Sequence, residues 1–453
     1  MINYFIKINK ESQNDNDNDE EDKGFNIITI SNQIIQTMGE IIRIFISDED
    51  IYSKIINHIN IILSYCINCD YYSIGRLEDG LDLLNDILVS SSNSQKNIFI
   101  IHKSLWMFYI NMLNTVIGSP QERKEFKSQF SFDKIYEGYG VDYINDICKI
   151  MSYYIYKDGN TFLNGRDNNN LSYYEYTIEF ISIVFDLCEK KKSLADIYSI
   201  VKFSNLIFEL FRGKVDLLYK SYIDNFDGKF SSNEKNILFV NSRYKNIITE
   251  CISSLIIYNP NYISSFNNII IFWLNNIEKC TTKKQYKINL ISLCSFLLNI
   301  NEQKINDEII KQVILLIYSL LSKFNAPSTS NTSETKKKQI INTNNNLDDE
   351  REEDLNDKVD ELIDFYNDIH NNNDNEQLEE DDYLDDDEEN ISNDYEEDNE
   401  FPTEISKQNE INCAKKSFEL LNNQSVEKIK IICGEELLQK LNNIIVNSSQ
   451  SNI

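Results

Sequence analysis

Apolar residues recur every three or four positions through most of the chain, which is the spacing of an amphipathic α-helix. Six of them between residues 34 and 45 define one face of a first helix, and five between residues 51 and 62 define a second. A polar, less regular stretch precedes residue 139. The other segments with helical spacing are 76–89, 95–118, 141–158, 173–190, 193–213, 215–226, 241–259, 261–280, 284–300, 307–324, 411–424 and 425–446.

These helices follow one another with short polar separators. The chain has only 12 Gly and 4 Pro among 453 residues, which favours long helices over a many-stranded sheet. A break about every 20 residues predicts antiparallel helical hairpins of about 40 residues, the period of HEAT and armadillo repeats. The predicted fold is therefore all-α, a HEAT/armadillo-like helical-repeat solenoid with a disordered acidic insert. No repeated sequence signature accompanies the period, so an irregular helical bundle stays open as an alternative.

Changes in composition divide the chain into four predicted parts. Residues 1–24 form a disordered lead, and 25–325 form the helical-repeat solenoid. Residues 326–400 contain a flexible linker and the acidic insert. Residues 401–447 form a C-terminal helical pair that packs on the solenoid.

The charge is concentrated in the insert. Between Asp348 and Glu400 there are 27 acidic residues and two basic ones, so this window carries −25 of the net charge of −29. Net charge bears on solubility and partners and not on fold. A near-neutral body with an anionic arm lacks the basic stripe of a nucleic-acid binder, so no direct nucleic-acid binding is expected.

Three interpretations fit the acidic run: an inert spacer, a cation site, or a surface for a strongly basic partner. A calcium loop of the EF-hand type requires a Gly, and the run has none, so no specific metal site is expected. The candidate residues for binding basic cargo are Glu380, Asp381, Asp382, Asp385, Asp386, Asp387, Glu388, Glu389, Asp394, Glu396, Glu397 and Asp398.

The sequence contains no enzyme signature that we recognise. The three histidines, at 58, 102 and 370, are far apart, and each is interpreted as structural. The pair Cys66 and Cys69 has CxxC spacing without a second ligand pair, which favours buried thiols. The segment 159–167 approaches a phosphate loop but lacks its Lys and hydroxyl, so we interpret it as an interhelical loop. We expect no enzymatic activity and no cofactor.

The two tryptophans, Trp106 and Trp273, lie at helical spacing and are expected in the core, with a groove for Phe-containing peptides as the minority interpretation. Nine scattered cysteines indicate a reduced, intracellular chain. No apolar run reaches the roughly 18 residues of a membrane span, and the N-terminus lacks the h-region of a signal peptide. We therefore expect no membrane association and a location in the cytoplasm or nucleus.

The order of segments in the C-terminal part resembles one protein family. The stretch IIYNPNYISSFNN (256–268) is followed by FWLNNIEKC (272–280), KKQYKINLISLCSFLL (283–298), the acidic insert and a last helical pair. This series is similar to the C-terminal half of importin-β-superfamily nuclear transport receptors of the importin seven/eight group. Segments 81–88, 137–163 and 173–190 match in the same order more loosely.

The resemblance implies a nuclear import receptor, or karyopherin, that carries basic cargo such as ribosomal proteins and histones through the nuclear pore. It implies Phe-Gly nucleoporins as partners, and a location in cytoplasm, nucleus and nuclear envelope. Ran GTPase would bind only through an N-terminal half that this chain lacks. The alternatives are a free-standing acidic chaperone for basic proteins and a helical scaffold with a solvated loop.

Overall fold

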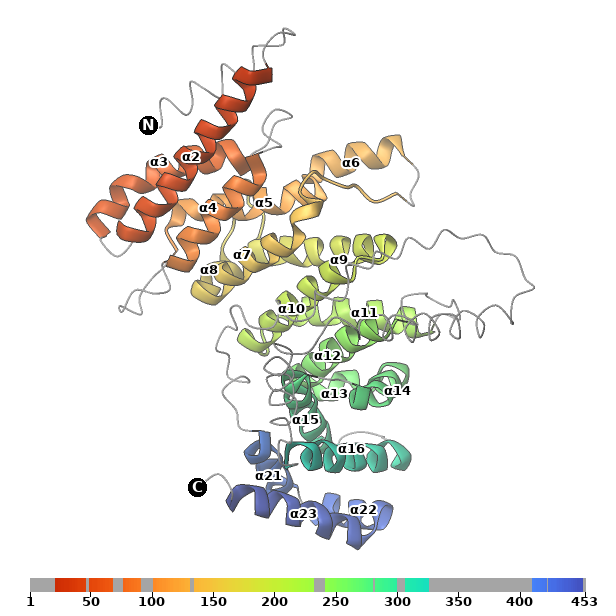
Figure 1. Ribbon diagram of the computed structural model, residues 1–453. Coiled ribbons are helices and arrows are strands. Elements are labelled where there is room, and N and C mark those ends of the chain that lie inside the picture. Colours follow the sequence, from red (N-terminus) through yellow and green to blue (C-terminus); the bar gives the residue numbers. More distant parts are fainter. Residues whose placement is uncertain are drawn as a thin grey trace, which may run out of the picture. The chain divides into compact units, whose positions relative to one another are not determined.

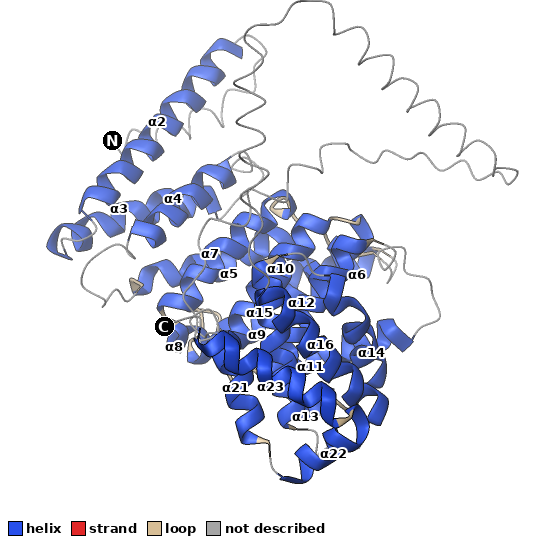
Figure 2. Cartoon of the chain, turned by 60° about the horizontal axis from the view of Figure 1, so that its bottom comes forward, coloured by secondary structure: helices blue, strands red, loops and turns tan. Residues whose placement is uncertain are grey.

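The computed structural model describes residues 21–45, 49–67, 76–90, 101–130, 134–231, 241–279, 282–299, 306–325, 410–421 and 423–450. These residues form α-helices and short 3₁₀ turns, and none of them belongs to a β-strand (Figure 2). One isolated bridge joins Arg166 to Ser172. The prediction of an all-α helical-repeat fold is confirmed.

The described helices follow the chain as successive pairs after a leading helix, α2 (Glu21–Phe45) (Figure 1). The first helices of the pairs are α3 (Glu49–Ile67), α5 (Met107–Ile117), α9 (Tyr173–Lys191), α11 (Asp216–Ser231), α14 (Asn267–Asn276), α16 (Asp307–Asn325) and α22 (Asn423–Cys433). The second helices are α4 (Leu77–Ser90), α7 (Ile144–Lys157), α10 (Leu194–Leu210), α12 (Ser242–Tyr258), α15 (Lys283–Leu298), α21 (Glu410–Leu420) and α23 (Glu435–Gln450).

Short helices connect these pairs. The α-helical connectors are α6 (Pro120–Gln129), α8 (Gly159–Asn164) and α13 (Pro260–Ile263). The 3₁₀ turns are η2 (Lys103–Trp106), η3 (Val141–Tyr143) and η5 (Ile277–Lys279).

The pairs stack so that helices of the same kind become neighbours. The second helices pack in the order α4, α7, α10, α12, α15, α21 and α23, which we call the second-helix ladder. The first helices α3, α5, α9, α11 and α14 pack in the same way and form the first-helix ladder. Each repeat thus contacts its sequence neighbours, as in HEAT and armadillo arrays.

The helices of the second-helix ladder run parallel to one another. Ser199 of α10 donates to Asn145 of α7 at 2.8 Å, near the start of both helices. Phe208 and Tyr258, near the ends of α10 and α12, have ring centroids 5.6 Å apart. Lys157, the last residue of α7, donates to the carbonyl of Leu88 near the end of α4. The helices α4, α7, α10 and α12 therefore begin at one edge of the ladder, the N-terminal edge.

Helix α12 shows how this stacking buries a helix on several sides. All residues from Ile247 to Ile257 are buried, because α10, α14 and α15 each contact the helix. Its buried polar residues are mostly small, and Ser253 is paired inside: it accepts from Trp273 Nε1 at 2.8 Å and donates to Asn289 at 2.7 Å. Burying a large apolar side chain contributes about 1.5–3 kcal/mol, so this helix anchors the array.

Both tryptophans lie in the core, as predicted. Trp273 is fully buried, and Trp106 is 2% exposed. The Trp106 ring lies 4.7 Å from Tyr173 and 4.9 Å from Tyr154, centroid to centroid, in tilted and edge-on arrangements. Such aromatic pairs add about 0.5–1.5 kcal/mol beyond their burial.

Helix α6 lies in the stretch that the sequence pattern left irregular, so that prediction was wrong. Its residues are almost all exposed, and no apolar stripe marks it. A capping box starts it instead: Ser119 and Glu122 bond each other's backbone N–H groups, with Pro120 at the first helical position. The buried Arg123 then fastens it to α9, through Tyr176 at 3.1 Å and Glu179 at 2.8 Å.

Other boundaries also differ from the sequence prediction. The segment 425–446 is not one helix, because Gly434 adopts φ +83° and separates α22 from α23. The segment 261–280 divides into α13, α14 and η5, and residues 159–164 form α8 where a loop was expected. Helix α2 begins at Glu21, inside the predicted disordered lead.

The chain between residues 326 and 409 connects the two helices of one pair. Helix α16, which precedes it, contacts α14 through Gln312 and Asn275 at 3.4 Å. Helix α21, which follows it, packs against α15, where Cys413 contacts the buried core residues Ile288 and Ile291. The predicted insert 326–400 itself lies outside the described residues.

Because buried contacts hold α21 to α15, we expect the chain to stay together after cleavage at a protease site introduced between residues 326 and 400. The two fragments should co-elute in gel filtration and separate only in denaturant. Ala414 of α21 is fully buried. The variant Ala414→Asp places an unpaired charge there and should release the C-terminal fragment. Release of that fragment from the otherwise unmodified nicked chain in native buffer would contradict the expectation.

Candidate functional site

The N-terminal edge of the second-helix ladder carries a group of carboxylates, which we call the acidic edge. Its members lie in the first two or three turns of α4, in η3 and the start of α7, and at the start of α10. They are Glu78, Asp79, Asp82, Asp86, Asp142, Asp146 and Asp196. Parallel stacking brings them together, because Asp82 and Asp146, and likewise Asp142 and Asp196, lie close enough to interact electrostatically.

The acidic edge is electrostatically unfavourable in the isolated chain. Partial burial, followed by the charges of Asp146 and Glu78, raises the pKa of Asp82 above its ordinary range. Partial burial also raises the pKa of Asp146, although the nearby Lys149 opposes this effect. Asp196 behaves in the same way, with burial as the main cause. Like charges held on rigid helices favour a cationic partner, which relieves their repulsion.

Tyr143 lies among these carboxylates. Its pKa is raised first by burial and then by the charges of Glu78, Asp142 and Asp146. A tyrosine ring beside several carboxylates suits the side chain of a Lys or Arg, since the ring accepts the cation or its aliphatic stem while the carboxylates bind the charged head. The combination is typical of a surface for a basic peptide segment.

Some of the charge is already compensated by the chain itself. Arg76 pairs with Asp79 at 3.2 Å, and Arg43 pairs with Asp86 at 2.7 Å. Ser193 donates to Asp196 at 2.6 Å. The most exposed members, Glu78, Asp82, Asp142 and Asp146, therefore carry the attraction for a partner.

The first-helix ladder carries a second candidate surface, a shallow pocket between α9 and α11. Its walls are aromatic and apolar, with three small polar side chains. The lining residues are Ile181, Ser182, Phe185, Ser221, Tyr222, Asn225 and Phe226. The amide oxygen of Asn225 is buried and has no hydrogen-bond partner in the structure. An apolar wall with an available acceptor suits an apolar side chain whose backbone N–H can donate.

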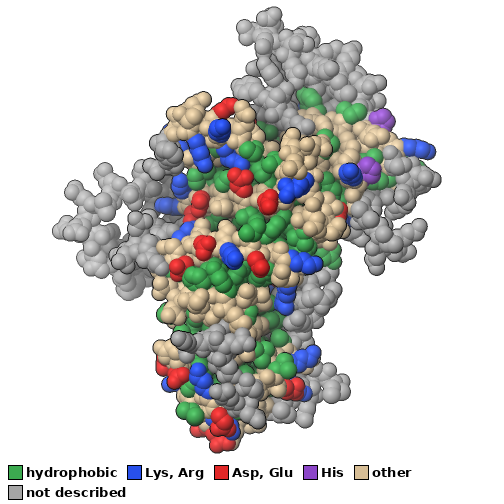
Figure 3. All heavy atoms as spheres, turned by 180° about the vertical axis from the view of Figure 1, so that it is seen from behind, with side chains coloured by type: hydrophobic (Ala, Val, Ile, Leu, Met, Phe, Trp, Pro, Cys, Tyr) green, Lys and Arg blue, Asp and Glu red, His purple; other side chains and the backbone are tan. Residues whose placement is uncertain are grey.

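Aromatic contacts continue from this pocket toward α14. The rings of Phe226 and Phe230 lie 6.0 Å apart, and those of Phe230 and Phe272 stack at 4.6 Å. Ile271, beside Phe272, is 49% exposed. Figure 3 shows a face of the molecule on which groups of hydrophobic side chains alternate with side chains of both charges.

A partly buried ionic network joins the helices around the pocket. Glu189 of α9 accepts hydrogen bonds from Lys229 of α11 and from Tyr244 of α12. The Lys229 ammonium also lies 4.5 Å from the Phe185 ring centroid. Since three helices meet at one carboxylate, its loss would leave Lys229 without this carboxylate and loosen both ladders.

The candidate cargo-binding residues between Glu380 and Asp398 all lie outside the described residues. Among the other candidate residues, His102 and Cys66 have structural surroundings. His102 accepts from Ser104 N and caps η2, and Cys66 is buried and outside any disulfide. His58 is exposed on α3, whereas Cys69 and His370 are outside the described residues.

Nowhere in the described part of the chain do three or more His, Cys, Asp or Glu side chains gather in a way that would hold a metal ion. None of its helices has the length and apolarity of a membrane span.

Comparison of the chain with protein-family models, with curated proteins and with solved structures finds no match. The resemblance to the importin seven/eight group therefore stays a prediction from the ordered segments.

Replacing Asp82 and Asp146 by Asn should stabilise the fold near neutral pH. A carboxyl whose folded pKa is raised contributes stability while it is protonated, and that stability is lost as pH rises through the folded pKa. The gain should be below about 1 kcal/mol, because both groups are partly exposed and screened. It should disappear below the ordinary aspartate value of 3.8, which thermal melts at several pH values measure.

The control is Asp86→Asn. That carboxylate accepts hydrogen bonds from Arg43 at 2.7 and 2.8 Å, so its loss should bring no gain in melting temperature. Equal gains in melting temperature from Asp82→Asn, Asp146→Asn and Asp86→Asn would contradict the expected repulsion between the stacked carboxylates.

Proposed function

We propose that the chain is the C-terminal part of a nuclear import receptor that binds basic protein cargo and has no enzymatic role. The acidic edge carries this proposal, because its carboxylates are stacked by the fold in mutual repulsion around Tyr143. Holding these carboxylates together lowers the stability of the fold, and binding of a Lys/Arg-rich partner would offset that loss. The insert, with −25 between Asp348 and Glu400, adds a second acidic segment from the sequence.

The fold supports the proposal in general terms. A helical-repeat array offers an extended surface on which a cargo can make many weak contacts. The first-helix ladder adds the pocket of Phe185, Tyr222 and Phe226, whose aromatic and apolar lining would suit contact with the Phe side chain of a Phe-Gly repeat. Cargo on one ladder and nucleoporin on the other would let both bind at once. Ran would act only through an N-terminal half absent from this chain.

The second candidate function is a free-standing acidic chaperone for histones or ribosomal proteins. The same acidic edge favours it, because shielding a basic protein requires only the carboxylates. The pocket on the first-helix ladder distinguishes the two, since a chaperone has no use for Phe-Gly repeats. A receptor would also move between cytoplasm and nucleus through the pore.

Neutralising either acidic segment should weaken binding of a basic ribosomal protein. One variant changes Asp82, Asp142 and Asp146 to Asn. The other changes the insert residues Asp381, Asp382, Asp385, Asp386, Asp387, Glu388 and Glu389 to Asn or Gln. Titration by fluorescence anisotropy should show weaker binding for each, a larger loss for both, and losses that shrink as salt rises.

The matched control neutralises Glu125 on α6 and Asp224 on α11, which are exposed acids away from the acidic edge. Binding that stays unchanged at low salt in both acidic variants would remove the receptor and the chaperone together. The insert would then be a spacer.

Filling the pocket between α9 and α11 should abolish binding of a Phe-Gly repeat peptide. Ser182→Arg and Ser221→Arg place a long cationic side chain at its lining without removing a core ring. Asp224→Arg, on the exposed side of α11, serves as the control. Calorimetric titration should show loss of peptide binding for the first two variants only. If the unmodified chain binds no such peptide, the chaperone becomes the better description.

A further inference from the structure

Helix α6 is held in a fixed orientation although it buries little of its surface. A capping box starts the helix. The buried Arg123 donates to the carbonyl of Gly118 and to the hydroxyl of Tyr176. It also pairs with Glu179 at 2.8 Å. Because the core gains little from α6, this fastening is explained better by what the exposed side of the helix presents, since a fixed surface loses little conformational freedom when a partner binds.

Three aromatic rings gather on and beside α6. Phe126 lies one turn before Phe130 at the end of the helix, and their ring centroids are 4.6 Å apart. The Tyr136 ring meets Phe126 edge-on at 5.5 Å. Phe126 and Tyr136 are half-buried, whereas Phe130 is 44% exposed. The cluster thus presents one open ring whose position is set by its neighbour Phe126.

The end of α5 holds Tyr136 in place. Gly118 adopts φ +71°, and a Cβ at that position would lie 2.7 Å from the Tyr136 ring. The ring packs there because residue 118 has no side chain. The backbone N–H of Gly138 donates to the carbonyl of Val116 at 2.8 Å. The aromatic cluster is therefore fastened to the array twice, through Arg123 and through Tyr136.

Three exposed lysines lie near the open ring. The Lys134 ammonium is 5.1 Å from the Phe130 ring centroid. Lys127 is one helical turn from Phe130, and Lys124 is one turn from Lys127, so these side chains are neighbours on the helix surface. Within the described ranges, neither Lys124 nor Lys127 forms an ion pair. We call the three lysines and the three rings the α6 patch: Lys124, Lys127, Lys134, Phe126, Phe130 and Tyr136.

Two acidic side chains beside the patch are engaged by other partners. Glu122 accepts from the N–H of Ser119 at 2.7 Å and so completes the capping box. Glu137 pairs with Lys191 at 2.6 Å. Neither carboxylate pairs with a lysine of the patch.

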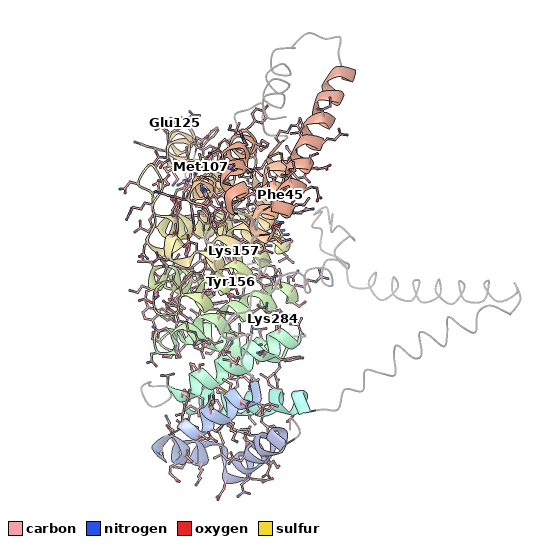
Figure 4. The ribbon with its side chains drawn as sticks, turned by 90° about the vertical axis from the view of Figure 1, so that its left-hand side faces the viewer. Phe45, Met107, Glu125, Tyr156, Lys157 and Lys284 are labelled. Atoms are coloured by element: carbon pink, nitrogen blue, oxygen red, sulfur yellow. The ribbon has the colours of Figure 1, made fainter. Side chains whose placement is uncertain are left out.

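The other acid of α6 lies on a different side of the helix. Glu125 precedes Lys127 by two residues, which is about 200° around the helix axis. It lies at the surface (Figure 4) and accepts from Gln121 at 2.8 Å. Asp133, next to Lys134 in the sequence, is outside the described residues. The described part of the patch therefore combines an open aromatic ring with an excess of positive charge.

We infer that the α6 patch binds an acidic peptide segment that carries a large apolar side chain. The apolar side chain packs on the open Phe130 ring, and carboxylates on either side of it bind Lys127 and Lys134. Charge complementarity of this kind sets the partner and its orientation more than it adds affinity, so the binding is weak and reversible.

A nucleic acid fits the patch less well. Proteins that bind single strands offer several rings on which successive bases stack, whereas Phe130 is the one open ring of this patch. The glutamates around α6 would also repel phosphates that continue past the three lysines.

An anionic membrane fits less well for a different reason. A helix that lies in a membrane interface buries a wide apolar face. Helix α6 has polar or charged residues around most of its surface, and Phe126 is half covered. A short peptide requires only one apolar contact and a few carboxylates, which matches the patch.

The test is a fluorescence anisotropy titration of the full chain against a labelled peptide in which one Leu is flanked on each side by two Asp. The charge variant carries Lys127→Glu and Lys134→Glu, and the ring variant carries Phe130→Ser. Each should bind the peptide at least about tenfold more weakly than the unmodified chain. The loss in the charge variant should shrink as salt rises, whereas the loss in the ring variant should persist. Peptides with Ser in place of Leu, or Asn in place of Asp, should bind the unmodified chain more weakly.

The control variant Lys214→Glu and Lys220→Glu reverses two exposed cations at and near the start of α11 and should bind the peptide normally. Circular dichroism checks folding, and Lys127→Gln replaces the charge variant if that variant does not fold. The inference is overturned if the unmodified chain does not bind the peptide, or if either variant binds as tightly as the unmodified chain. It is also overturned if a single-stranded oligonucleotide or vesicles of anionic lipid bind through these residues and the peptide does not. Neither basic cargo nor a Phe-Gly peptide enters the experiment, so its outcome is independent of the import proposal.

Discussion

Parallel stacking of the second helices is the constraint on which the rest of the structure depends. The inner helices α7, α10 and α12 are each covered by their predecessor, their successor and a helix of the first-helix ladder. That coverage explains why eleven consecutive residues of α12 are buried and why Ser253 bonds across to α14 and α15. Contacts also fix the direction of the helices: Phe208 and Tyr258 meet near the ends of α10 and α12, and Tyr244 at the start of α12 meets Glu189 just before α10. The first turns of α4, α7, α10 and α12 therefore lie at one edge.

At that edge, the preference of α4, α7 and α10 for acidic residues in the first turn produces one continuous acidic surface. Acidic residues at a helix start are ordinary, since they compensate the dipole of their own helix. When three such helix starts are stacked, their carboxylates come close enough to repel one another around Tyr143. The first-helix ladder has a different chemistry, with rings from Phe185 to Phe272 following successive helices. Two surfaces with different chemistry therefore arise from one repeated hairpin.

The acidic segment has a definite place in the connectivity. It separates α16 from α21, the two helices of one pair, and α21 packs beside α15 as though the connection were short. Loop-closure entropy grows slowly with length, so a long connection costs the pair little. The array can thus carry a strongly charged segment between consecutive helices without losing the stacking of the helices that flank it.

The sequence by itself determined the helices and the repeat, because apolar spacing of 3.6 residues and scarce Gly and Pro act locally. It also located the charge between 348 and 400. It failed where the signal was not apolar: α6 depends on the capping box of Ser119 and on Arg123 reaching α9, and Gly434 divides a continuous pattern. The acidic edge was visible only as separate carboxylates. Which of them meet depends on a register of 54 or 64 residues between helices, and only tertiary packing decides that.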